Sequence, residues 1–147
     1  MKKKIFSVAA PGFLALLTSA IVYAQIPGTV LRVSIPFDFT VAGKSLPAGD
    51  YEVKRVTDSQ EVLLISGTGT ESHSHVLFQT NSVQASKIPN QGELIFHEYG
   101  NSYFLSEVFT GGEQTGRELL TSRQERALES NLASNGTKPQ TVALLAN

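Results

Sequence analysis

Alternation between apolar and polar side chains over residues 31–41 is the feature that most constrains the fold. The odd positions of this stretch are Leu31, Val33, Ile35, Phe37, Phe39 and Val41. A period of two held over this length is typical of a half-buried β-strand. Pro36 lies in the middle and has no N–H to donate to a strand partner, so we expect an edge position, a bulge or a break there. The stretch can therefore be two strands, at about 29–35 and 37–41.

Turn residues divide the rest of the chain into further short strands. The segment LPAG at 46–49 predicts a type I turn, with Pro47 at its second position and Gly49 at its fourth. Apolar and β-branched residues then predict strands at 51–56, 61–66, 74–83, 93–99 and 102–109. The last two are separated only by Gly100 and Asn101, which form a favourable two-residue hairpin loop.

This hairpin loop predicts a strand register. Tyr99 should lie opposite Ser102, His97 opposite Phe104, and Phe96 opposite Leu105. One face would then carry Leu94, Phe96, Tyr103 and Leu105, and the other Ile95, His97, Tyr99, Phe104 and Val108. Because both faces are largely apolar, we expect the hairpin to be covered on both sides, by the rest of the sheet and by a helix.

The sequence near the C-terminus supplies one helix. Ser122 is a candidate N-cap and Glu125 follows three residues later, as in a capping box, while Gly136 is a candidate stop. We expect residues 135–147 to form a flexible tail, and whether the apolar run 142–146 docks is left open. The prediction is a mainly β domain over residues 25–134: an antiparallel sandwich or partly open barrel of six to eight strands with one C-terminal helix.

The first 24 residues have the pattern of a signal peptide. Lysines at positions 2–4 precede an apolar stretch, and Val22 and Ala24 are suited to positions −3 and −1 of a cleavage site. We expect cleavage after Ala24 and export to the periplasm or the external medium, with an uncleaved membrane anchor as the alternative. Cleavage removes three of the 12 basic residues and leaves 13 acidic ones, a formal charge of −4. This charge favours neither nucleic acid nor stable membrane insertion of the mature chain.

Three segments and the signal peptide together resemble a known group of proteins. The segments are VSIPFDFTVAGKSLPAGDYEV, LIFHEYGNSYFLSEVF and GRELLTSRQERALE. They are similar to small exported bacterial β-rich proteins of unknown function, and the likeness covers most of residues 29–130. The resemblance implies an exported β-rich domain with a C-terminal helical segment. It implies no activity and no site residues.

Few residues suggest metal chemistry. His73 and His75 would point to one side of a strand and could present two metal ligands, and His97, Glu71 or Glu98 could add a third. Solvated histidines at a loop end are the simpler interpretation, and His97 is simply explained as a hydrogen-bonded residue on a packed strand. We therefore assign no metal ligands and no cofactor.

Acid–base and nucleophilic catalysis also lack a clear motif. Glutamates 93 and 98, or 107 and 113, could form acid–base pairs, but carboxylates at strand ends are usually solvated. The chain has no cysteine and no G-x-S-x-G motif. Catalytic residues are not assigned. The segment GRELLTSRQERALE offers arginines and glutamates either as a solvated helix face or as a polar docking surface.

These observations favour a non-enzymatic exported domain, a binding or structural module of the cell envelope or secretome. Its partner would be another envelope or secreted protein. The alternative is a carrier that holds a small apolar ligand in a barrel interior lined by Phe37, Phe39, Phe78, Phe96 and Leu105. A metal-dependent hydrolase is a weaker third hypothesis.

Overall fold

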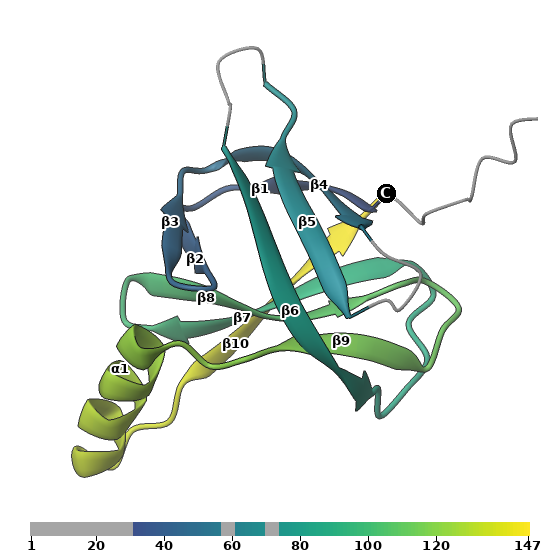
Figure 1. The fold of residues 1–147 in the computed structure, drawn as a ribbon. Coiled ribbons are helices and arrows are strands. Elements are labelled where there is room, and N and C mark those ends of the chain that lie inside the picture. The colour runs from purple at the N-terminus through teal and green to yellow at the C-terminus, as the bar shows by residue number, and fades with distance from the viewer. Residues whose placement is uncertain (1–30, 57–60, 70–73) are drawn as a thin grey trace, which may run out of the picture.

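A computed structural model describes residues 31–56, 61–69 and 74–147. In these ranges the chain forms ten strands and one helix (Figure 1). The elements are β1 (Leu31–Ile35), β2 (Phe39–Val41), β3 (Lys44–Leu46), β4 (Gly49–Arg55), β5 (Val62–Gly67), β6 (His75–Gln84), β7 (Gly92–Tyr99), β8 (Ser102–Phe109), β9 (Thr115–Leu119), α1 (Arg123–Ser134) and β10 (Gln140–Ala146). The predicted signal peptide lies outside the described residues.

The strands form one strongly curved mixed sheet. Its hydrogen-bonded order runs β1-β4-β5-β6-β9-β8, and β8 pairs in turn with β7, which pairs with β10. These pairs are antiparallel, but β2, which also pairs with β3, lies parallel to β8. At the two ends of this order, Arg32 of β1 and Asn147 after β10 exchange backbone hydrogen bonds of 3.0 and 2.8 Å. Despite this contact, the sheet is not closed into a barrel. The mainly β prediction is confirmed, whereas the sheet is mixed and has more than the expected six to eight strands.

The opening stretch is divided at Pro36, as the sequence suggested. β1 ends at Ile35 and pairs with β4, whereas β2 begins at Phe39 and pairs with β3 and β8. The odd-numbered side chains from 31 to 41 are buried, except that of Phe37, which is half-buried against the core. The LPAG turn is held from both sides, because the Tyr51 hydroxyl donates to the Pro47 carbonyl at 2.6 Å and the Ala48 N–H donates to Asp38 Oδ1 at 2.9 Å.

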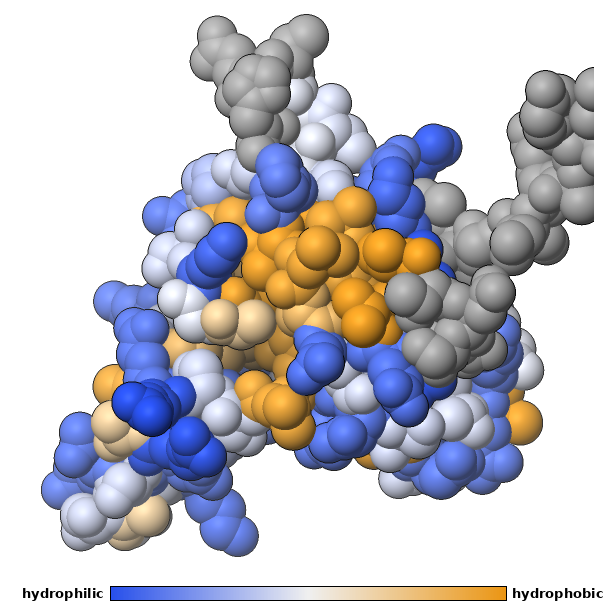
Figure 2. Space-filling model, viewed as in Figure 1, coloured by the Kyte–Doolittle hydropathy of each residue, from blue (hydrophilic) through white to orange (hydrophobic). Residues whose placement is uncertain are grey.

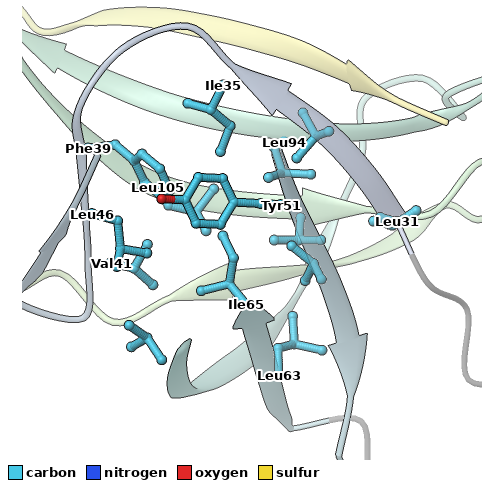
Figure 3. Packing of buried hydrophobic residues seen from close by; sticks show 14 of the residues in the cluster. Leu31, Ile35, Phe39, Val41, Leu46, Tyr51, Leu63, Ile65, Leu94 and Leu105 are labelled. Carbon is cyan, nitrogen blue, oxygen red and sulfur yellow. The ribbon is translucent and has the colours of Figure 1, made fainter. Parts of the chain in front are cut away.

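Aliphatic side chains pack around aromatic rings in the core inside the curved sheet (Figure 3). The rings of Phe37 and Phe39 meet Phe96 edge-on, with centroids 5.3 and 5.6 Å apart, and Phe39 also meets Tyr51 edge-on at 5.1 Å. Phe78 and Leu105 belong to the same cluster of buried side chains. The five residues proposed to line a ligand cavity therefore contribute to one packed core.

The hairpin of β7 and β8 has the predicted register at its loop, from Tyr99–Ser102 to Phe96–Leu105. Beyond Phe96 the register shifts, so that Ile95 lies opposite Glu107 and Ser106 is the extra residue of a β-bulge. The bulge places Val108 opposite Leu94, in the core. The prediction that Val108 shares a face with His97 is wrong for this reason.

Helix α1 begins where the sequence predicted it. Ser122 is the N-cap, and its Oγ accepts a hydrogen bond from the Glu125 N–H at 3.1 Å. Gly136 follows the helix with a φ of +69°, a conformation that glycine adopts readily at a helix end. Figure 1 shows the first turn of α1 near the loop end of the β7–β8 hairpin and the rest of the helix running away from the sheet. Glu125 in that turn is the buried residue of the helix, so α1 covers less of the hairpin's second face than predicted. Among the described residues, no helix combines the length and hydropathy needed to cross a bilayer.

The segment 135–147 differs from its prediction as a flexible tail. Residues 140–146 form β10, which pairs with β7 along its whole length. Ala146 is buried, and Val142 and Leu144 pack against the core. The apolar run 142–146 therefore docks as a strand, because β7 would otherwise be left with one unpaired edge.

Candidate docking surface and buried polar cluster

Glu125 is the charged side chain that lies deepest in the described part of the molecule, with 6% of its surface exposed. It sits in the first turn of α1 and points at the outer face of β7. Its Oε1 lies 3.0 Å from His97 Nδ1 and accepts a hydrogen bond from the Tyr99 hydroxyl at 3.3 Å. The glutamate expected to complete a capping box thus joins the helix to the sheet.

Ser106 extends this cluster on the other side of the imidazole. Its Oγ lies 3.2 Å from His97 Nε2, and the residue is 7% exposed. Because Ser106 is the extra residue of the bulge, it has no register partner in β7, β2 or β9. The cluster therefore runs from Ser106 through His97 to Glu125, with Tyr99 as a second donor to the same carboxylate oxygen.

The electrostatics of the cluster favour a protonated imidazole. The hydrogen bond that the imidazole donates to Glu125 raises the pKa of His97, and burial opposes this, while the negative charges of Glu125, Glu107 and Glu129 add to the increase. Burial, and then the charge of Glu125, raise the pKa of the Tyr99 hydroxyl. Tyr99 therefore stays protonated and keeps donating to the carboxylate.

The structure does not bring the three candidate metal-ligating histidines together among the residues that it describes. His73 and Glu71 lie outside those residues. His75 is exposed at the start of β6, whereas His97 lies under α1. In the described ranges, no three His, Cys, Asp or Glu side chains are placed to hold a metal ion.

The candidate acid–base carboxylates also have separate environments. Glu98 accepts a hydrogen bond from the Tyr103 hydroxyl at 2.9 Å, and Glu113 lies 3.5 Å from Arg55. Glu107 is half-buried on β8, where burial and the charge of Glu118 raise its pKa. Glu93 is half-buried at the far end of β7 from Glu98.

The segment GRELLTSRQERALE is divided between β9 and α1. Arg117 on β9 is half-buried, and its Nη1 donates to Ser82 Oγ at 2.9 Å. It lines a hollow of about 270 Å³ together with Glu61, Leu120 and four polar residues of β6, at positions 79–82. On α1, Arg126 and Glu129 are exposed. The segment therefore offers a polar surface in two separate pieces.

An apolar surface lies on the outer face of β4, β5 and β6 (Figure 2). We call it the outer patch, and it consists of Val56, Val62, Leu64 and Leu77. Leu64 and Leu77 lie opposite each other, and the Val56 N–H donates to the Val62 carbonyl at 3.1 Å. Val56 is 50% exposed and Leu77 is 58% exposed. Four apolar side chains thus face outward together. The core does not require them to be apolar, because the buried residues of these strands lie on the opposite face.

The outer patch borders an unpaired strand edge. β6 pairs with β5 through residues 75–79 and with β9 through residues 80–84, on opposite sides. Gly67 and Ser74, like Glu61 and Thr80, are joined by backbone hydrogen bonds. The antiparallel pattern then turns the backbone groups of Leu77 and Gln79 away from β5. In the described part of the chain no strand pairs with that edge.

Sequence reasoning missed the polar cluster and the outer patch. The predicted register did place His97 opposite Phe104, so Ser106 two residues later could have been placed on the face of His97. Glu125 was identified only as a capping residue. Comparison of the chain with protein-family models, with curated proteins and with solved structures found no match.

Proposed function

We propose that the mature chain is an exported binding module of the cell envelope or secretome that docks one partner polypeptide. The outer patch together with the unpaired edge of β6 is the observation that carries this proposal. Leu77 belongs to both, because its side chain points outward and its backbone groups lie on the open edge.

The partner that fits this surface is an extended segment of another envelope or secreted protein. Backbone N–H and C=O groups in a row are matched by another strand, which adds to the sheet edge through main-chain hydrogen bonds. Alternate side chains of that strand would lie beside Leu77 on the outer face of the sheet. The partner should therefore be a strand with apolar residues at every second position.

A carrier function has less support from the same observations. The aromatic rings expected to line a ligand cavity contact one another, and the hollow beside Arg117 has polar walls. An apolar ligand would have to displace rings that are already packed. Such displacement costs more than filling a preformed cavity.

The experiment is a crosslinking study of the mature protein in the native envelope fraction. A photo-crosslinking residue replaces Leu77 in one variant and Ile88 in a control, because Ile88 is similarly exposed at 50% but lies in the loop before β7. We expect one crosslinked partner from position 77 and none from position 88. The isolated complex should protect the amides of residues 77 and 79 from hydrogen exchange.

Leu77→Asp tests the same surface in solution. The substitution should weaken binding of the isolated partner at least tenfold, whereas Ile88→Asp should leave it unchanged. Equal binding by both variants would contradict the proposal. Crosslinks only between copies of this chain would instead identify self-association and overturn the choice of partner.

A further inference from the structure

We propose that Ser106 is a nucleophile activated by His97 and Glu125, able to accept the acyl group of a small ester. The proposal goes beyond partner docking and uses a different part of the molecule, at the junction of β7, β8 and α1. It also departs from the expectation of a non-enzymatic domain.

The hydrogen bonds of the cluster have the order that activates a serine. Glu125 Oε1 accepts from the Nδ1 side of the imidazole at 3.0 Å, which selects the tautomer with the proton on Nδ1. Once the imidazole has lost its second proton, Nε2 carries none and faces Ser106 Oγ at 3.2 Å as an acceptor. An acid, an imidazole and a hydroxyl in this order are recognised by geometry and not by sequence position.

The position of the acid adds to this argument. Glu125 is 6% exposed and also accepts from the Tyr99 hydroxyl, so its carboxylate is held in place by two donors. A fixed carboxylate orients the imidazole and stabilises the positive charge that the imidazole gains when it takes a proton. Joining α1 to β7 needs only Glu125 with its two donors, whereas the contact with Ser106 adds a path for a proton.

Access restricts the substrate to a small group. The side chain of His97 is 35% exposed, so solvent reaches the imidazole, whereas Ser106 is only 7% exposed. Ser106 lies two residues after Phe104, the register partner of His97, and therefore on the same outer face of the hairpin as the imidazole. A short acyl chain on a good leaving group is therefore the class of substrate that fits.

The reaction balances without a cofactor. Ser106 Oγ attacks the acyl carbon as its proton passes to His97 Nε2, and the bond to the leaving oxygen breaks as that oxygen takes the proton back from Nε2. Water then attacks the acyl-serine, again giving a proton to Nε2, which returns it to Ser106 Oγ. The products are the carboxylic acid and the alcohol.

The test is covalent labelling of the mature protein with diisopropyl fluorophosphate, followed by peptide mass mapping. We expect one adduct per chain, on Ser106, and no adduct in Ser106→Ala. Ser102→Ala is the matched control, because Ser102 is an exposed serine on the same strand, and it should be labelled at the wild-type rate. An adduct on any other serine, or none, would overturn the proposal.

Dependence on His97 separates an activated serine from a structural one. His97→Gln should label at least 100-fold more slowly, within the range for loss of a general base. Circular dichroism shows whether that variant is folded. The labelling rate of the wild-type protein at several pH values tests His97 without any substitution. The wild-type rate should rise with pH as His97 loses its proton. The groups that face the imidazole are Glu125, Glu129 and Glu107, which raise its pKa, and Tyr99, which donates to Glu125. A wild-type rate that does not change with pH would refute the role of His97.

Discussion

Replacing Glu125 by alanine should destabilise the domain more than any other exchange on α1. The carboxylate accepts from His97 at 3.0 Å and from Tyr99 at 3.3 Å, and a hydrogen bond to a charged group contributes about 1.5–3 kcal/mol. His97 is about one-third exposed, so in the variant water can accept the hydrogen bond that His97 donated to Glu125. The buried Tyr99 hydroxyl, in contrast, loses its acceptor. We expect a loss of about 3 kcal/mol in the free energy of unfolding for Glu125→Ala. Glu125→Gln keeps an acceptor oxygen and should lose about 1 kcal/mol.

Urea unfolding followed by far-ultraviolet circular dichroism measures this loss. With a slope of about 1.5 kcal/mol per molar urea, the midpoint of Glu125→Ala should fall by about 2 M. The cap is unaffected, because the Ser122 hydroxyl bonds to the backbone of residue 125. Glu129→Ala is the control, because Glu129 is exposed one turn further along the helix. A midpoint for Glu125→Ala that matches the control would refute the idea that Glu125 joins α1 to the sheet.

The same interaction gives stability a pH dependence of known sign. Glu125 raises the pKa of His97 in the folded protein, so the folded state binds this proton more tightly than the unfolded state. The added stability is fully present below the ordinary pKa of histidine, about 6.5, and is lost as the pH rises through the raised value. The advantage of the wild-type protein over His97→Gln should therefore be larger at pH 5.5 than at pH 9. An advantage that does not change between these pH values would contradict this linkage.

Two further predictions concern the fold and the export of the chain. Gly116→Ala should lower the free energy of unfolding by about 1–3 kcal/mol, because a Cβ there would overlap the buried ring of Phe109. Thr115→Ala, its exposed neighbour, should stay within about 0.5 kcal/mol of wild type in the same urea experiment. N-terminal sequencing of the exported protein should begin at Gln25, and a mature chain that keeps residues 1–24 would contradict cleavage at Ala24.

The sequence by itself determined the local elements and the hairpin. Alternation marks β1 because one face of that strand must be hidden, and Pro36 divides it from β2 because proline cannot donate to a strand partner. The hairpin register follows from Gly100 and Asn101, since a two-residue loop leaves one way to pair the strands beside it. Ser122 marks the start of α1 because its hydroxyl satisfies an N–H that the first turn leaves unpaired.

The tertiary structure alone decided which of these elements meet. His97 and Glu125 are 28 residues apart, and only the packing of α1 on β7 joins them. Val108 enters the core because of a bulge at Ser106 that the apolar pattern of β8 does not reveal, and residues 140–146 become a strand because β7 has an edge to pair. Local periodicity and turn chemistry act over a few residues. Contacts between distant segments depend instead on which edges and faces remain uncovered once the strands have formed.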